Sequence, residues 1–146
     1  MCNALKLGEN LSALMAEHNL KAPAFAKILK IDRSTITEYQ RNKRTPTFSV
    51  FISMIEYFNI SADVFLGLID YSPVTAFLPL PPFGTNLRAV MEETKTSQYR
   101  IEKDLHISGS TMYNWLTNKS LPNVESLIKL SKYMDVSIDY LLGRIS

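Results

Sequence analysis

The stretch that decides the fold is Ile107–Pro122, ISGSTMYNWLTNKSLP. Met112 and Trp115 stand three positions apart, which places them on one face of a helix, while Ser, Thr and Asn occupy the other faces. A small polar loop and a proline end the segment. A short helix that hides apolar residues and exposes hydroxyl and amide groups is suited to contact a polar partner, and we interpret this partner as a groove of DNA.

The same pattern occurs once earlier in the chain, at Ile31–Pro46, IDRSTITEYQRNKRTP. Ile36 and Tyr39 take the places of the two apolar residues named above. Shifting the sequence by 76 residues, which sets Gly8 on Gly84, aligns it with itself without a gap to the C-terminus, and about a third of the aligned positions are identical. Similarity at a fixed offset is the mark of an internal duplication, so the chain consists of two copies of one small unit.

Each copy contains five apolar segments at helical spacing, and neither contains the strict alternation that is typical of a strand. We therefore predict an all-α fold with two tandem five-helix domains, copy one at residues 1–70 and copy two at residues 83–146. An apolar, Pro-rich linker at residues 71–82 joins them.

The boundaries of individual helices follow from their capping residues. In copy one, Asp32 or Ser34 is expected to cap the third helix, and Thr47 or Ser49 is expected to begin the fourth. The residues expected to face the core of copy one are Leu7, Leu11, Leu14, Met15, Phe25, Ile28, Leu29, Ile36, Tyr39, Val50, Phe51, Met54, Ile55, Phe58, Val64, Phe65 and Leu66. Those of copy two are Leu87, Val90, Met91, Ile101, Leu105, Met112, Trp115, Leu127, Ile128, Leu130, Met134, Ile138, Leu141 and Leu142.

The linker, YSPVTAFLPLPP, contains four prolines, which prevent a helix and favour an extended chain. It has no charged residue and includes Phe77 and Leu78. A flexible linker is usually polar, so we expect this one to lie against one or both domains. Fully extended, it reaches on the order of 37 Å, at about 3.1 Å per residue.

Composition and charge set limits on location. The 146 residues include 16 Lys and Arg against 14 Asp and Glu, a mildly basic balance that neither requires nor excludes nucleic acid. The single cysteine, Cys2, cannot form an internal disulfide, which favours a reducing cytoplasm. No apolar run approaches the roughly 18 residues of a membrane span, and no signal peptide is visible. We expect a cytoplasmic protein that does not contact membranes.

The residues that carry catalytic chemistry form no recognisable motif. His18 and His106 are isolated from other residues at metal-ligand spacing, so no metal site is expected. We find neither a nucleophile motif nor a Gly-rich phosphate loop. The sequence therefore predicts no enzyme, no cofactor and no small-molecule ligand.

The run Ser97–Gly143 resembles the lambda-repressor-like, Cro-type helix-turn-helix domain, also called the XRE family. The resemblance is carried by an SQ pair at its start, by the spaced residues Leu105 and Ile107 followed by SGSTM, and by the tail VSIDYLLG at residues 136–143. The gapless alignment extends it to Leu7–Gly67 of copy one. The resemblance implies a bacterial or phage-encoded protein that is associated with the nucleoid.

The resemblance also implies that the third helix of each copy is a recognition helix whose N-terminal half enters the major groove. The positions that usually face the bases correspond to Arg33, Ser34, Thr37 and Glu38 in copy one and to Gly109, Ser110, Tyr113 and Asn114 in copy two. Arg favours guanine, Asn favours adenine and Glu accepts from cytosine, so the two copies should prefer different half-sites.

Phosphates are held by cations, hydroxyls and amides. The family's phosphate-binding Gln corresponds to Gln98, whereas copy one has Ala22 at that position. The other expected phosphate-binding residues are Arg41, Lys43, Arg44, Tyr99, Arg100, Asn118 and Lys119. Residues 27–44 contain six basic and two acidic residues, whereas residues 103–120 contain two and one, so copy one should provide the stronger electrostatic attraction.

Two positions depart from the family pattern. The family usually pairs a Glu after the Trp position with a basic residue on the first helix, but these positions are Gln40 with Met15 in copy one, and Leu116 with Met91 in copy two. We therefore expect packing to replace the ion pair, a change that is often neutral or stabilising. The Gly that follows the recognition helix is replaced by Asn in both copies, and Asn also tolerates a left-handed backbone.

These expectations combine into one function: sequence-specific binding of double-stranded DNA by a transcriptional regulator, a repressor, that reads two half-sites with two recognition helices. Dimeric relatives hold these helices about 34–36 Å apart, and the linker is long enough for one chain to supply both. The alternative architecture is a homodimer formed through apolar residues of the C-terminal helices. The residues considered for that contact are Phe65, Leu68, Leu141 and Ile145.

A function of another class stays open at this point. Either copy could serve as a protein-interaction module, such as an antirepressor or a regulator that sequesters a partner. Two observations favour this function: Ala22 replaces the phosphate-binding Gln in copy one, and copy two carries little positive charge. A basic rim around the third helix favours DNA, whereas an apolar or acidic rim favours a protein partner.

Overall fold

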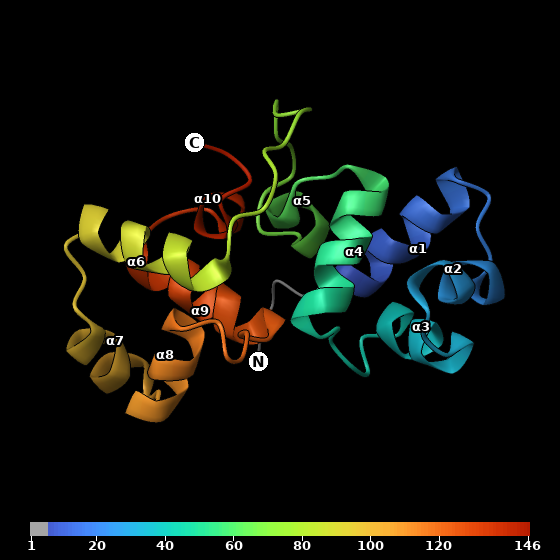
Figure 1. The fold of residues 1–146 in the computed structure, drawn as a ribbon. Coiled ribbons are helices and arrows are strands. Elements are labelled where there is room, and N and C mark those ends of the chain that lie inside the picture. The colour runs from blue at the N-terminus through green and yellow to red at the C-terminus, as the bar shows by residue number, and fades with distance from the viewer. Residues whose placement is uncertain (1–5) are drawn as a thin grey trace. The chain divides into compact units, whose positions relative to one another are not determined.

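The computed structural model describes residues 6–146, so Cys2 lies outside the described part of the chain (Figure 1). The described residues form ten helices and no strand, which confirms the predicted all-α fold. The chain divides into two compact units, Met1–Thr75 and Ala76–Ser146. The helices of the first unit are α1 (Leu7–Glu17), α2 (Ala22–Leu29), α3 (Arg33–Gln40), α4 (Phe48–Phe58) and α5 (Ala62–Leu66). Those of the second are α6 (Phe83–Glu93), α7 (Gln98–Leu105), α8 (Gly109–Leu116), α9 (Val124–Met134) and α10 (Ile138–Leu142).

Most helices begin at a polar side chain that accepts a hydrogen bond from the backbone N–H three positions later. The residues that cap in this way are Thr47, Ser61, Ser97, Ser108, Asn123 and Ser137. Of the two expected starting points for α4, the structure has Thr47, and of the two for α3 it has Asp32, whose side chain makes no capping hydrogen bond. Because each hydrogen-bonded cap satisfies an N–H group that the helix itself leaves unpaired, the six capping residues fix helix boundaries that sequence periodicity alone does not define.

The core of each unit consists largely of the predicted residues, with one clear exception. Ile28 was expected to face inward, but its side chain is 46% exposed. The helix α2 instead turns Phe25 and Ala26 toward the core. At about 100° per residue, Ile28 lies about 110° from the mean direction of Phe25 and Ala26, so it stands beside the buried face of α2 rather than at its centre. Leu14, Leu29, Val50, Val64 and Leu105 are half-buried rather than enclosed.

An asparagine near the start of the first helix of each unit ties that helix to the last one. The side-chain amide of Asn10 donates to the carbonyl oxygens of Val64 and Phe65, at 3.2 and 2.8 Å. In the second unit, Asn86 bonds the corresponding carbonyls of α10 at 3.0 and 2.7 Å. The carbonyls of Val64 and Tyr140 also accept from the N–H groups of Gly67 and Gly143. The asparagines therefore add hydrogen bonds at the C-terminal end of a five-residue helix, where the last carbonyls have few partners within the helix.

A second asparagine ends the recognition helix of each unit. Asn42 and Asn118 adopt the left-handed conformation, with φ of 57° and 62°, as the sequence predicted. The side-chain oxygen of Asn42 accepts from the backbone N–H of Gly8 at 3.0 Å, and Asn118 does the same with Gly84 at 2.8 Å. Each recognition helix is therefore fixed at its C-terminal end to the start of the first helix in its unit.

The linker is hydrogen-bonded to the first unit at Thr75 and to the second unit at Leu78. In the first unit, the side-chain amide of Asn59 donates to the carbonyl of Thr75 at 3.1 Å. In the second unit, the N–H of Leu78 donates to the carbonyl of Arg144 at 2.8 Å, and the Arg144 guanidinium lies 3.9 Å from the centre of the Phe77 ring. Arg144 is itself buried and pairs with Asp139 at 2.7 Å.

The homodimer contact considered above is wrong for two of its four residues. Phe65 and Leu141 are fully buried inside their own units, because α5 and α10 turn these side chains toward the core. Leu68 and Ile145 are half-buried. Phe65 and Leu141 therefore cannot contribute to an interface between chains without unfolding the unit.

Candidate nucleic-acid interface

The helix α3 is oriented by two buried residues. Ile36 and Tyr39 are fully or nearly fully enclosed, and burial raises the pKa of the Tyr39 hydroxyl. Both side chains therefore belong to the core, as predicted, and the opposite face of α3 is open. The residues on the open side are Arg33 and Ser34, which are exposed, and Thr37 and Glu38, which are half-buried.

An open hollow of about 320 Å³ lies along this face of α3 and the loop after it. Its lining residues are Ser34, Thr37, Glu38, Arg41 and Lys43. The structure therefore brings together two hydroxyls, one carboxylate and two cations in one concave surface. These are the donor and acceptor types that contact base edges and phosphates.

Arg44 follows Lys43, a lining residue of the hollow, in the sequence. It forms an ion pair with Glu38, with an Nη1–Oε1 distance of 3.2 Å. Both side chains are about half exposed. An ion pair in such a position contributes about 0–1 kcal/mol to stability, so it exchanges readily for another partner. In the free protein the ion pair keeps Glu38 and Arg44 side by side, and both side chains can still exchange it for contacts with another molecule.

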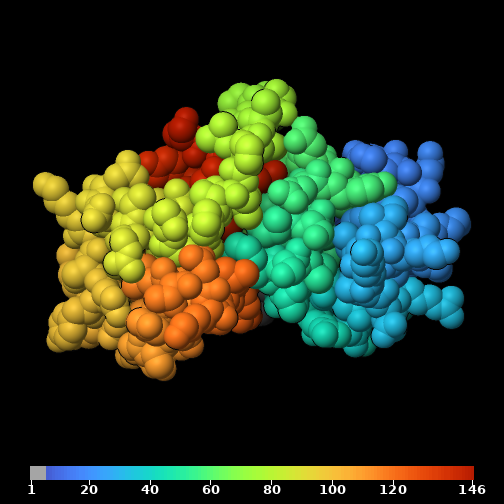
Figure 2. Space-filling view, in the orientation of Figure 1, coloured from blue at the N-terminus to red at the C-terminus, as the bar shows by residue number. Residues whose placement is uncertain are grey.

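The helix α8 presents the corresponding face of the second unit. Its start is fixed by Ser108, whose hydroxyl oxygen accepts from the N–H of Thr111 at 3.1 Å, and Met112 and Trp115 face the core. Figure 2 shows α8 and the loop after it, in orange, open on the surface of the unit. The predicted base-reading residues Gly109, Ser110 and Tyr113 are exposed, and Asn114 is half-buried.

Tyr113 projects outward and is partnered by a cation. Its side chain is 54% exposed, and the Lys119 ammonium lies 5.0 Å from the centre of its ring. A cation over an aromatic face is attracted by the negative charge density of the ring. The two residues therefore form one amphipathic group beside α8, although sequence reasoning gave them separate roles.

The start of α7 carries Gln98, Tyr99 and Arg100, all exposed as expected. The side-chain amide of Gln98 donates to the Glu102 carboxylate, with an Nε2–Oε2 distance of 2.8 Å. Sequence reasoning missed Glu102, although the spacing of four residues between Gln98 and Glu102 is the spacing at which helical side chains meet. The predicted phosphate-binding amide is therefore already hydrogen-bonded in the free protein.

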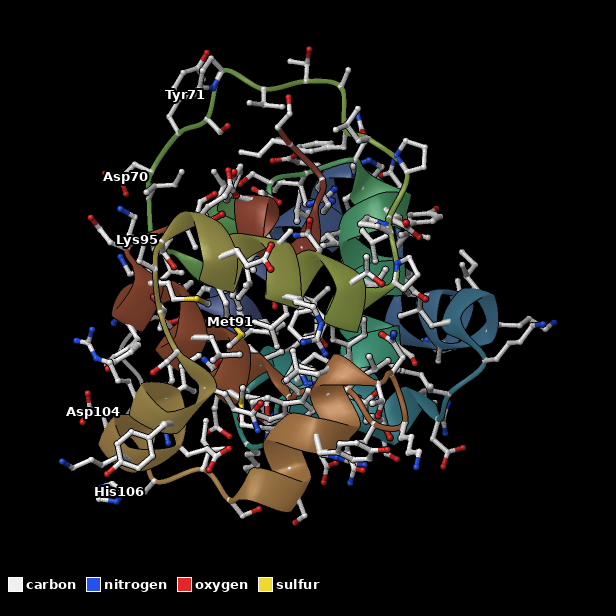
Figure 3. The ribbon with its side chains drawn as sticks, turned by 60° about the vertical axis from the view of Figure 1, so that its left-hand side comes forward. Asp70, Tyr71, Met91, Lys95, Asp104 and His106 are labelled. Atoms are coloured by element: carbon white, nitrogen blue, oxygen red, sulfur yellow. The ribbon has the colours of Figure 1, made fainter. Side chains whose placement is uncertain are left out.

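Asn118 is also hydrogen-bonded within its unit, because its side-chain oxygen accepts from the backbone N–H of Gly84. Its exposed side chain retains N–H groups that point away from this bond. The turn between α7 and α8 contains His106, which has a left-handed backbone with φ of 56°. Figure 3 shows Asp104 and His106 together at this outer end of the unit, where Asp104 accepts a hydrogen bond from the hydroxyl of Tyr133.

A family model described as "Helix-turn-helix" matches the chain twice, at residues 11–65 and 87–141. The chain belongs to the XRE-type helix-turn-helix family. No curated protein and no solved structure shows significant similarity to it. The two matches coincide with the two structural repeats, and the family is one of DNA-binding transcription regulators rather than of enzymes.

Within this helix-turn-helix framework, the absence of the family's ion pair has a structural explanation in each copy. In copy one, the Gln40 amide bonds the Met15 sulfur at 3.6 Å and the Ser12 hydroxyl at 3.2 Å. In copy two, Met91 and Leu116 are both buried. The family's ion pair is therefore replaced by an amide–thioether contact in one copy and by apolar burial in the other.

Within residues 6–146, no cluster of three or more His, Cys, Asp and Glu side chains is arranged to hold a metal ion. Within the same residues, no helix has both the length and the apolar character needed to cross a bilayer.

Proposed function

We propose that this helix-turn-helix protein binds double-stranded DNA sequence-specifically as a transcriptional repressor, with α3 and α8 each reading one half-site. The observation that carries the proposal is the hollow on α3, which sets Ser34, Thr37 and Glu38 beside Arg41 and Lys43. Side chains with donors and acceptors for base edges thus adjoin cations for the phosphates.

The base-reading residues proposed for α3 are Arg33, Ser34, Thr37 and Glu38, and those for α8 are Gly109, Ser110, Tyr113 and Asn114. Arg33 would recognise guanine and Asn114 adenine, each by a bidentate pair worth about 1–3 kcal/mol of discrimination. Since the two sets differ, the operator would be an imperfect palindrome. Repression requires only that the bound protein blocks the site, which two DNA-binding copies are sufficient to do.

The phosphate contacts proposed for copy one are Arg41, Lys43 and Arg44. Those proposed for copy two are Gln98, Tyr99, Arg100, Asn118 and Lys119. With two recognition helices on one chain, a monomer would bind as a pseudo-dimer to half-sites about ten base pairs apart. A homodimer with four recognition helices is the alternative assembly, and measurement of the mass of the DNA complex distinguishes the two.

The experiment is a selection of bound sequences from a random duplex pool. It uses the intact protein, Arg33→Ala and Asn114→Ala, with Lys129→Ala on the exposed side of α9 as the surface control. The expected result is a two-part motif in which each variant relaxes only its own half, while the control reproduces the wild-type motif.

If no sequence is enriched over non-specific binding at moderate salt, the DNA-regulator proposal fails. The competing function is then that of a protein-interaction module. Ala22 in copy one and the Gln98–Glu102 pair in copy two favour it, because both reduce the predicted hold on phosphates.

A further inference from the structure

The carboxylate of Glu102, a residue in the middle of α7, lies close to the first residue of α7 and to the first residue of α8 in the second helix-turn-helix unit. One carboxylate oxygen accepts from the Gln98 amide at 2.8 Å. The other lies 3.5 Å from the position that a Cβ on Gly109, the first residue of α8, would occupy. The carboxylate therefore rests against the N-terminal end of the proposed recognition helix while it holds the proposed phosphate-binding amide.

The two copies differ at both positions of this pair. In the gapless alignment, Gln98 corresponds to Ala22 and Glu102 corresponds to Ala26. Ala26 is buried, and α2 packs closely along α3. Glu102 is half-buried, and α7 lies less closely along α8. The amide and the carboxylate are present together in one copy and absent together in the other, as expected if they act as a pair.

We propose that Glu102 lowers the affinity of copy two for DNA of any sequence by placing a negative charge beside the phosphate contact proposed for Gln98. This proposal rests on the proposed function. A carboxylate beside the backbone contact of Gln98 repels phosphates whatever the base sequence, so copy two contributes to binding only where its base contacts compensate. Copy one, with four cations among its proposed contact residues, provides the non-specific attraction.

Non-specific affinity comes almost wholly from phosphate contacts, and a regulator must find its site among a large excess of other sequences. A carboxylate that repels phosphates weakens specific and non-specific binding by copy two by the same factor, so it leaves their ratio unchanged. Its effect is that copy two depends on its base contacts to stay bound, while copy one provides most of the attraction that every sequence shares.

The test is Glu102→Gln in the full-length chain, because glutamine keeps the size and the acceptor oxygen but removes the charge. The control is Asp135→Asn, which removes one charge from an exposed position of the same copy and suits the left-handed backbone there. Binding of a labelled duplex of mixed sequence, about 30 base pairs long so that it spans two half-sites, is measured by fluorescence anisotropy over a series of salt concentrations. Thermal melting verifies that each variant is folded.

Glu102→Gln is expected to bind the mixed-sequence duplex about three- to tenfold more tightly. The slope of log K against log salt concentration should become steeper by up to about 0.9, the value for one additional neutralised phosphate. Asp135→Asn should change neither quantity.

The proposal is overturned if Glu102→Gln matches the wild type, or if Asp135→Asn gives the same gain, since that would show an effect of net charge alone. If Glu102→Gln binds mixed duplex more weakly, the carboxylate positions Gln98 for binding and the sign of the proposal is wrong. If neither the wild type nor any variant binds duplex DNA at low salt, the proposed function fails together with this inference.

Discussion

The side-chain oxygen of Asn118 lies 2.8 Å from the backbone nitrogen of Gly84, so the end of α8 is hydrogen-bonded to the start of α6. The approach is close enough that a Cβ on Gly84 would lie 2.4 Å from the carbonyl oxygen of Leu116 and 2.5 Å from that of Trp115. Copy one repeats the relationship between Asn42 and Gly8. The recognition helix is thus held by a backbone contact for which only glycine leaves room.

Gly84→Ala is therefore expected to lower the free energy of unfolding of copy two by about 1–3 kcal/mol or more, the usual cost of overpacking. Gly109→Ala is the matched control, because its Cβ would meet nothing closer than 3.5 Å. Alanine there should leave stability unchanged or raise it by up to about 1 kcal/mol. Urea unfolding followed by Trp115, the single tryptophan, reports on copy two. Equal stability of the two variants would contradict the close contact.

Arg144→Ala removes one partner of a buried ion pair with Asp139 and the cation over Phe77. Removing one partner of a buried ion pair typically costs about 3–5 kcal/mol, so copy two should be strongly destabilised. The N–H of Leu78 should also exchange faster with solvent, because its acceptor is the carbonyl of residue 144. Trp115 fluorescence and amide hydrogen exchange measure the two effects, with exposed Arg88→Ala as the control that stays near wild type.

The pH dependence of copy two should include the Tyr140 hydroxyl. Its pKa is raised above 10.0, chiefly because the hydroxyl donates to the Glu93 carboxylate, at 2.6 and 2.8 Å from its two oxygens. Because the pKa is higher in the folded state, the protonated hydroxyl stabilises the fold. This contribution is fully present at a pH below the ordinary pKa of tyrosine, and it is lost as the pH rises through the pKa of the folded state. Glu93→Gln should lower the pKa of Tyr140 toward 10.0 in an ultraviolet titration. An unchanged titration would show that the hydrogen bond does not perturb the hydroxyl, and Glu92→Gln serves as the control.

Ile28→Asp tests the exposed face of α2. The aligned residue of copy two, Asp104, accepts from Tyr133, which aligns with Tyr57. Because Ile28 is already largely exposed, the substitution should change stability by no more than about 1 kcal/mol. Phe25→Ala, at a fully buried position, should cost about 3–5 kcal/mol. Circular dichroism during urea unfolding compares them, and a loss of similar size for both would place Ile28 in the core.

Periodicity and repeat symmetry predicted several elements correctly: the ten helices, the inward positions of Ile36, Tyr39, Met112 and Trp115, and the left-handed asparagines. These features depend on neighbours within one turn of the chain, so local sequence contains them. The burial of Phe65 and Leu141 was also predicted, which rules out the homodimer contact considered for the same two residues. The exposure of Ile28 was not predicted, since an apolar residue on a short helix is compatible with a core position and with a surface position.

The sequence by itself determined the helical class, the duplication and the place of the third helix in each copy, because each follows from a pattern of residue types along the chain. Only the tertiary structure decided which polar atoms were already paired. Asn118 is hydrogen-bonded to Gly84, 34 positions away in the sequence. The carboxylate of Glu102, which belongs to α7, bonds Gln98 and lies against Gly109 at the start of α8. Hydrogen bonds require atoms to be within about 3 Å, and the distance between two residues is set by how the helices pack rather than by their order in the sequence.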